Sequence, residues 1–303
     1  MKRPNCSTIK RITMLNILIT GANGQLGKEM RKLGTASADN YIYTDVAELD
    51  ITDADAVDRF IVMNDINVIV NCAAYTNVEK AEGDEAAADK INHRAADNLA
   101  KSAKKCRATL IHVSTDYVFD GHKNTPYTED ETPSPLGAYG RTKLDGEKAI
   151  IESGCKYIIV RTAWLYSEYG NNFVKTMLRL TSERESVNVV SDQIGSPTYA
   201  GDLGAAIFDI IEHRKFDGNM GIYNYTDEGV CSWYDLAHET ARIAGNKQCN
   251  VRPCRTWEYP TKAERPSYSV LDKSKFKETF GSDIPYWRES LGKCIKNLKN
   301  NKI

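Results

Sequence analysis

The sequence predicts an α/β fold, in which a doubly wound parallel sheet is accompanied by a smaller lobe built from the C-terminal part of the chain. Three observations favour this fold. Short apolar runs alternate with helix-like segments, a glycine-rich turn directly follows the first run, and the alternation loosens after about residue 165. Alternating strands and helices are typical of parallel sheets, because each crossover between parallel strands needs a long connection that is usually a helix.

The expected strands are apolar, largely β-branched runs that end at glycine or polar residues. They are Leu15–Thr20, Tyr41–Asp45, Asn67–Cys72, Ala108–Ser114, Tyr157–Ala163 and Val187–Val190. The expected helices between them are Gln25–Leu33, Asp53–Asn64, Glu85–Lys104, Tyr139–Ser153 and Asn172–Thr181. Nearly continuous apolar strands indicate a sheet that helices cover on both faces.

The composition is that of an ordinary globular protein, with 41% hydrophobic and 27% charged residues among 303. A net charge of −1 gives no electrostatic reason to expect a nucleic-acid partner. No apolar run approaches the roughly 20 residues that span a bilayer, and no apolar signal-peptide core follows the basic N-terminus, so we expect no membrane association. The eight cysteines are scattered without a C-x-x-C pair, which favours free thiols and a cytoplasmic location.

The turn Gly21-Ala-Asn-Gly-Gln-Leu-Gly27 follows the first strand and opens a helix. The first glycine permits a tight turn, the second lets the backbone approach a pyrophosphate, and the third lets the helix pack on the sheet. The helix N-terminus then offers free N–H groups to phosphates. An ordinary strand-to-helix turn is the alternative, but the position after the first strand favours a dinucleotide site in a Rossmann-type fold.

Residues 14–165 are therefore the predicted NAD(P)-binding domain. Residues 166–303 are expected to form mainly a substrate-binding lobe, with segments that return to the first domain, and residues 1–13 a disordered extension. Asp45 closes the second strand, where a carboxylate can accept hydrogen bonds from ribose hydroxyls and repel a 2′-phosphate. This favours NADH over NADPH, although a turn-forming aspartate would explain the residue equally well.

Tyr139 and Lys143 lie four residues apart, so on a helix they share one face. A nearby ammonium is expected to lower the pKa of the tyrosine and make it a usable general acid for a carbonyl that becomes an alkoxide. Ser114-Thr115-Asp116 ends the fourth strand, where the Thr115 hydroxyl can donate to the same carbonyl. Each motif alone has an ordinary explanation, as a chance match or a capping cluster; in this order along the chain they indicate carbonyl reduction.

The strings GANGQLG, STDYVFDG, YGRTKLDGE and DQIGSPT resemble the extended short-chain dehydrogenases/reductases, and more narrowly the dTDP-4-dehydrorhamnose reductase family. The resemblance runs from about Leu15 to the end of the chain. It implies reduction of the C4 keto group of a dTDP-linked keto-sugar by NADPH or NADH. Two alternatives stay open: another nucleotide-linked 4-keto sugar, or a non-catalytic nucleotide-binding subunit similar to the regulatory subunit of methionine adenosyltransferase.

The resemblance implies a catalytic set of Thr115, Tyr139 and Lys143, with Asp116 beside it. Together with the glycine turn it implies cofactor contacts from Gly21, Asn23, Gly24, Gln25, Leu26, Gly27, Asp45, Asp50, Ile51, Ala73, Ala74, Tyr75, Thr76, Tyr139 and Lys143. Substrate contacts are expected from Val78, Thr115, Tyr139, Trp164, Asn172, Gln193 and Arg265. For Arg265 a surface salt bridge, and for Trp164 a place in the core, are the competing explanations.

Tyr117 follows Asp116, where related dehydratases tend to carry a glutamate, and this favours reduction without elimination. Some members of the family are homodimers bridged by Mg²⁺ through carboxylates, and Glu29 could serve such a site. Gly201 stands where a second carboxylate would be expected, with Asp202 one step away. The sequence therefore puts Mg²⁺ binding in doubt, predicts no metal ligand, and leaves a homodimer open.

Overall fold

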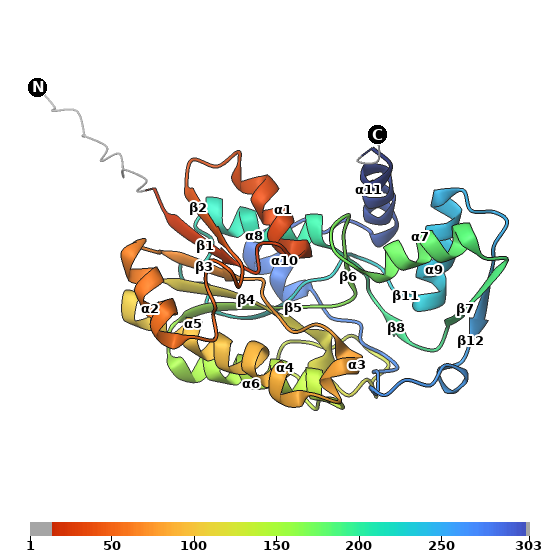
Figure 1. Ribbon diagram of the computed structural model, residues 1–303, viewed down its shortest axis with the longest axis horizontal. Helices are drawn as coiled ribbons and strands as arrows, with labels where there is room; N and C mark the ends of the chain where they lie inside the picture. Colours follow the sequence, from red (N-terminus) through yellow and green to blue (C-terminus); the bar gives the residue numbers. More distant parts are fainter. Residues whose placement is uncertain (1–13, 301–303) are drawn as a thin grey trace, which may run out of the picture.

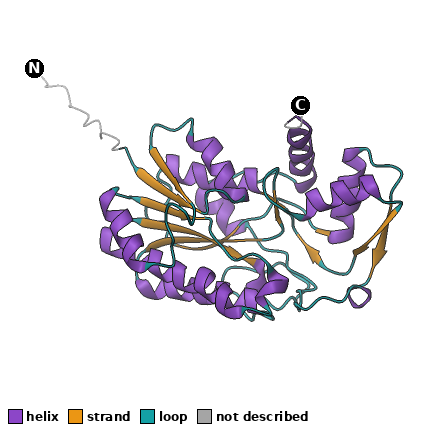
Figure 2. Cartoon of the chain, in the orientation of Figure 1, coloured by secondary structure: helices purple, strands orange, loops and turns teal. Residues whose placement is uncertain are grey.

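The computed structural model describes residues 14–300, so the predicted N-terminal extension, residues 1–13, lies outside the described residues. Helices cover both faces of a central sheet, and a smaller lobe lies beside it, with the C-terminal helix between the two (Figure 1). Figure 2 shows the same layers coloured by secondary structure.

The central sheet has six strands, all parallel, in the order β2-β1-β3-β4-β5-β10. The strands are β1 (Asn16–Thr20), β2 (Asn40–Thr44), β3 (Val68–Asn71), β4 (Thr109–Thr115), β5 (Lys156–Thr162) and β10 (Gly221–Asn224). The chain moves from β1 to β2 on one side and then returns to place β3 on the other side. Ligands of doubly wound sheets bind at such a reversal, outside the carboxyl ends of the strands.

Two helical layers bury the sheet (Figure 1). One layer consists of α2 (Ala54–Met63), α5 (Ala95–Cys106) and α6 (Ala138–Ser153); the other consists of α1 (Gln25–Gly34), α8 (Ala200–Glu212) and α10 (Ser274–Phe280). Each layer has its own apolar core against one sheet face. The α/β fold with a parallel Rossmann-type sheet, predicted from the sequence, is confirmed, with most element bounds within two residues of those expected.

Three elements differ from the sequence prediction. Val187–Val190 lies in β7 (Ser186–Val190), which pairs with β12 (Asn250–Cys254) in a separate two-stranded sheet. The sixth strand of the main sheet is instead β10. β7 is only partly buried, unlike the inner strands of the main sheet, and an apolar run cannot by itself reveal which sheet a strand joins. The expected helix over 85–104 is α4 (Glu85–Asp89), a π-helical turn (Lys90–Arg94) and α5.

The smaller lobe has a core of its own, in which Trp287 and Leu291 are buried. Its elements are β6 (Leu165–Tyr166), α7 (Phe173–Glu183), β7, β8 (Ile194–Gly195), β9 (Thr198–Tyr199), β11 (Cys231–Ser232), α9 (Trp233–Ala244), β12, the 3₁₀ turn η3 (Thr256–Glu258) and α11 (Trp287–Asn300). The short α3 (Val78–Ala81) and the 3₁₀ turn η2 (Asp116–Val118) belong to loops at the carboxyl edge of the main sheet.

Three segments of the C-terminal half pack on the main sheet, namely α8, β10 and α10. The domain boundary at residue 165 stays a prediction. Within residues 14–300 the seven cysteines are free thiols, and none of the helices has the length and apolar character needed to cross a membrane.

The contact of α1 with the sheet allows a matched test of core packing. Met30 on α1 is 0% exposed, whereas Met63 at the end of α2 is 81% exposed. We expect Met30→Ala to lower the free energy of unfolding by about 2–5 kcal/mol, because it leaves a cavity in the core. Met63→Ala should change it by less than about 0.5 kcal/mol. Denaturant unfolding followed by circular dichroism measures both, and equal losses would contradict this packing.

Candidate active site

The glycine turn joins β1 to α1 and lies against the end of β3. Gly21 has a φ of +63°, and a Cβ there would lie 2.7 Å from the backbone of Ala73. A Cβ on Gly27 would overlap with the carbonyl oxygen of Gly21. Gly24 precedes α1 without a side-chain cap, which leaves the first N–H groups of the helix free to meet a phosphate. Gly21 and Gly27 therefore have the steric causes that the sequence suggests, and the role of Gly24 beside a pyrophosphate stays a prediction.

A cavity of about 400 Å³ lies beside this turn, at the reversal between β1 and β3. Seven predicted cofactor residues line it: Gly21, Gly24, Asp45, Asp50, Ile51, Ala73 and Ala74. It is also lined by residues that the sequence did not single out, Val46, Leu49, Thr52, Cys72, Lys90 and Ile91. Lys90 and Ile91 begin the π-helical turn, whose extra residue leaves no readable mark in helical periodicity.

The other residues predicted to bind the cofactor through the turn and the β3 loop do not line this cavity: Asn23, Gln25, Leu26, Gly27, Tyr75 and Thr76. The N–H of Asn23 donates to Asp45 over 3.0 Å, which ties the turn to the end of β2. Asp45 also accepts the N–H of Val46, so both of its oxygens take part in holding the rim of the cavity. Its carboxylate is nevertheless part of the cavity wall.

Thr115 and Asp116 lie buried at the carboxyl end of β4. The Oγ1 of Thr115 donates to Oδ1 of Asp116 over 3.0 Å and accepts the N–H of Tyr117 over 3.2 Å. Burial raises the pKa of Asp116 to about 6, and hydrogen bonds from Ser269 and Thr115 oppose that rise. The strand end thus presents a hydroxyl whose orientation a buried acid sets.

Tyr139 lies in the first turn of α6, close enough to Thr115 for the threonine hydroxyl to oppose the rise of its pKa. Gly140 permits this approach, because a Cβ there would overlap with the carbonyl oxygen of Tyr117. Burial raises the pKa of Tyr139 to about 12, and the Thr115 hydroxyl only partly opposes it. The expectation that Lys143 lowers the tyrosine pKa is therefore wrong for the protein in its free form.

Lys143 is 1% exposed, and its Nζ donates to the carbonyl of Val113 over 2.7 Å. Because the ammonium is directed at this carbonyl, it does not lower the pKa of Tyr139. The same nitrogen lies 3.3 Å from Nε2 of His112. Burial lowers the pKa of Lys143 to about 8, while the charge of Glu147 opposes this. The lysine ammonium thus faces β4, through the carbonyl of Val113 and the imidazole of His112.

Glu147, one turn after Lys143, locks α6 to the sheet. Nη2 of Arg161 on β5 lies 2.7 Å from Oε2 of Glu147, and Nε of the same guanidinium donates to Oε1 over 3.0 Å. Ser114 on β4 also donates to this carboxylate. All three side chains are buried. The position of α6 is therefore set by a buried, bidentate ion pair rather than by apolar contacts alone.

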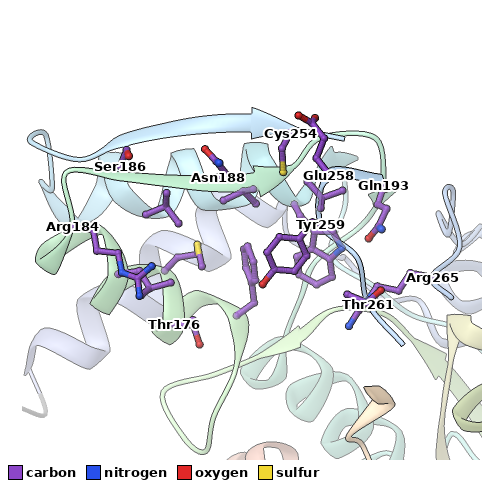
Figure 3. A pocket seen from close by; sticks show the side chains of 17 residues that line it. Thr176, Arg184, Ser186, Asn188, Gln193, Cys254, Glu258, Tyr259, Thr261 and Arg265 are labelled. Carbon is purple, nitrogen blue, oxygen red and sulfur yellow. The ribbon is translucent and has the colours of Figure 1, made fainter. Parts of the chain in front are cut away.

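A second cavity, of about 770 Å³, lies in the smaller lobe between α7, β7 and the segment around η3. Gln193 and Arg265, both predicted substrate residues, line it. Arg184 and Arg265 lie at opposite ends of the cavity, with Tyr259 between them (Figure 3). Arg265 forms a 2.6 Å ion pair with Glu79. Its charge opposes the rise that burial causes in the pKa of Tyr117, whose ring packs edge-on against that of Tyr139. The cavity wall thus reaches the residues beside Thr115.

The other five predicted substrate residues do not line this cavity: Val78, Thr115, Tyr139, Trp164 and Asn172. Trp164 stacks on Trp233, with ring centroids 3.6 Å apart, and Trp233 rather than Trp164 faces the cavity. Asn172 caps α7 through Oδ1 and donates from Nδ2 to Gln25 over 2.9 Å, so its amide joins the lobe to the start of α1.

Sequence reasoning missed Arg184, Tyr259 and the apolar wall from α7. For Tyr259 the only signal is the cluster of aromatic residues and prolines between Arg252 and Tyr268, which points to no particular ligand.

The residues present do not fit the Mg²⁺ site that the resemblance suggested. Burial and the neighbouring Glu168 raise the pKa of Glu29 to about 7, so at neutral pH this carboxyl is partly protonated and is a poor metal ligand. Asp202 is already bound by Ser290 and by Lys293, the latter over 3.2 Å. Among residues 14–300 no group of three or more His, Cys, Asp or Glu side chains could hold a metal ion.

The comparisons with known proteins agree with this geometry. The family model described as the RmlD substrate binding domain matches residues 15–300. A dTDP-4-dehydrorhamnose reductase of Aggregatibacter actinomycetemcomitans is 42% identical, covering 94% of this chain and 99% of that protein.

Two crystal structures are similarly close. A dTDP-4-dehydrorhamnose reductase from Clostridium acetobutylicum is 44% identical with a TM-score of 0.90, covering 94% of this chain and 100% of that one. A dTDP-4-dehydrorhamnose reductase from Bacillus anthracis, in complex with NADP, is 38% identical with a TM-score of 0.89 and the same coverage of both chains.

The packing of α6 on the end of β4 can be tested at its glycine. We expect Gly140→Ala to lower the free energy of unfolding by about 1–3 kcal/mol, the usual cost of inserting an atom where there is no room. The control is Gly292→Ala on α11, where a Cβ would meet nothing within 4 Å. It should stabilise the protein by about 0.5–1 kcal/mol, as alanine does in a helix. Thermal unfolding measures both, and a neutral Gly140→Ala would refute the close contact.

Proposed function

The chain belongs to the family described as the RmlD substrate binding domain, and on that basis we propose that it reduces the C4 keto group of dTDP-4-dehydro-L-rhamnose to give dTDP-L-rhamnose, with NADPH or NADH as reductant. The product would serve as a precursor of cell-surface polysaccharide. The observation that carries the proposal is the meeting of Thr115 and Tyr139 at the carboxyl edge of the sheet, with Lys143 on the same helix. This is what a catalyst of carbonyl reduction requires, and a purely regulatory nucleotide-binding subunit would not.

The proposed cofactor residues suit a nicotinamide dinucleotide. The glycine turn lets the start of α1 approach a pyrophosphate, and the small side chains of Ala73 and Ala74 leave room against the end of β3. When bound, the dinucleotide supplies the hydride. The relative in complex with NADP, at 38% identity over nearly the whole chain, supports a cofactor of this class.

Tyr139 is the proposed proton donor. Because its pKa in the free protein is about 12, the phenol keeps its proton at neutral pH and can give it to an oxygen that becomes an alkoxide. The Thr115 hydroxyl can turn from Asp116 to that oxygen and orient it, since a hydroxyl hydrogen rotates freely. The ammonium form of Lys143 would stabilise the phenolate that remains.

The larger cavity supports a nucleotide-linked substrate. The guanidinium of Arg265, at the end of the cavity near Tyr117, can bind a charge of the diphosphate. The aromatic rings of Tyr259, Trp233 and Phe173 can pack on a base. Tyr117 occupies the position after Asp116 and offers no carboxylate for elimination. The division into a cofactor domain, 14–165, and a mainly substrate-binding lobe, 166–303, is part of the proposal, as are a cytoplasmic location and a homodimer.

We expect Tyr139→Phe to lower turnover by about 10²–10⁴-fold, because the general acid is lost. Dinucleotide affinity should change little, since the ring remains. The assay follows nicotinamide absorbance with dTDP-4-dehydro-L-rhamnose generated in situ, alongside a direct binding titration. Tyr157→Phe, near the amino end of β5 and away from the carboxyl edge of the sheet, is the control and should retain activity. Full turnover in Tyr139→Phe would sink the assignment, and turnover only with another 4-keto sugar would correct the substrate.

The carboxylate of Asp45 predicts a preference for NADH. We expect Asp45→Asn to raise the ratio of kcat/KM for NADPH to that for NADH by about five- to tenfold, which corresponds to the removal of one repulsive contact in water. Steady-state kinetics with both cofactors measure the ratio. Asp65→Asn removes the same charge from an exposed turn before β3 and should leave the ratio unchanged. An unaltered ratio in Asp45→Asn would show that this carboxylate does not discriminate.

A further inference from the structure

The protonation state of Lys143 is set by groups on three strands and its own helix. His112 on β4 faces its Nζ, and Tyr139 and Glu147 belong to the same face of α6. Glu147 is neutralised by Arg161 of β5. Behind His112 lies Asn71, the last residue of β3, with its Nδ2 3.0 Å from Nδ1 of the imidazole.

The orientation of the Asn71 amide follows from its other contacts. The backbone N–H of Ala73 points at Oδ1 of Asn71 over 3.1 Å, and the hydroxyl of Thr20 lies 2.8 Å from the same atom. A backbone N–H can only donate, so the atom that it meets must be the amide oxygen. The amide nitrogen therefore faces His112 and donates to it.

This donation places the proton of the imidazole. His112 is buried, and burial together with the nearby Lys143 holds its pKa well below the usual value, so the ring is neutral and carries one proton. Nδ1 accepts from Asn71, and the proton must therefore be on Nε2, which lies 3.3 Å from Nζ of Lys143. An ammonium has no lone pair for this N–H, whereas a neutral amine has one.

We propose that Asn71 and His112 are positioning residues: the amide holds the imidazole in its Nε2–H tautomer, and this N–H favours the neutral amine of Lys143 over the ammonium. The lysine keeps its hydrogen bond to the carbonyl of Val113 in either state. Asn71 and His112 do not act on the reacting atoms themselves. Both act through Lys143.

The consequence for turnover rests on the proposed function. Tyr139 needs the ammonium form of Lys143 to stabilise its phenolate, and that form is present below the pKa of the lysine and is lost above it. Burial, opposed by the charge of Glu147, already lowers this pKa to about 8. Reduction should therefore fall on the alkaline side, at a pH that the Asn71–His112 pair determines.

The tautomer can be measured on the full-length protein without any substrate. In long-range ¹H–¹⁵N spectra of ¹⁵N-histidine-labelled protein, a neutral imidazole shows one pyrrole-type and one pyridine-type nitrogen, and His112→Gln identifies the signals among the five histidines. We expect the pyrrole-type nitrogen of His112 to be Nε2 at neutral pH. A proton on Nδ1, or a doubly protonated ring, overturns the proposal whether or not the protein is a reductase.

The second arm uses Asn71→Asp, which keeps an oxygen for Ala73 and Thr20 but replaces the amide donor by an acceptor. The proton should then move to Nδ1, and Nε2 should accept from the ammonium of Lys143. We expect the alkaline limb of the kcat profile to move up by about one pH unit.

Asn67→Asp, an exposed residue just before the same strand, adds an equal charge and should leave the profile in place. If the proton of His112 moves to Nδ1 in Asn71→Asp but the alkaline limb of the kcat profile stays in place, the proposal is also refuted. If that variant does not fold, the spectrum of the unaltered protein still decides.

Discussion

The close seating of α6 against the ends of β4 and β5 is the constraint on which the candidate site depends. Two features produce it: the missing side chain at Gly140, and the buried pairing of Glu147 with Arg161 and Ser114. A buried ion pair gains stability only when its geometry is good, because both charges lose their hydration. Here the guanidinium meets the carboxylate with two nitrogens, so the helix has little freedom to slide or rotate. The contact of Tyr139 with Thr115 is a consequence of that fixed position.

Much of this arrangement follows from local sequence. The strand and helix pattern, the positive φ of Gly21, the steric need for Gly27, and the shared face of Tyr139 and Lys143 all depend on residues within one or two turns of each other. These features are predictable because hydrophobic period and close backbone contacts leave a clear mark in the sequence.

What the sequence could not predict depends on partners far away along the chain. The carbonyl that takes the hydrogen bond of Lys143 lies 30 residues before it, and the imidazole beside it lies 31 residues before it. The spacing of Tyr139 and Lys143 therefore predicts their common face but not the direction of the ammonium. The larger cavity likewise combines α7, β7 and the η3 segment, which are separated by tens of residues. The sequence also could not predict that β10, rather than β7, forms the edge of the main sheet. The pairing partner of a strand is set by residues far away along the chain.

The return of the C-terminal half to the main sheet has a consequence for how the chain could be divided. Because β10 covers the edge of β5, and α8 and α10 cover the face beneath α1, a fragment that stopped near residue 165 would expose an unpaired strand and a bare apolar surface. Unpaired edges and apolar faces of this kind promote aggregation. Because the backbone crosses between the two lobes several times, they are better regarded as one cooperative folding unit than as two independent domains joined by one linker.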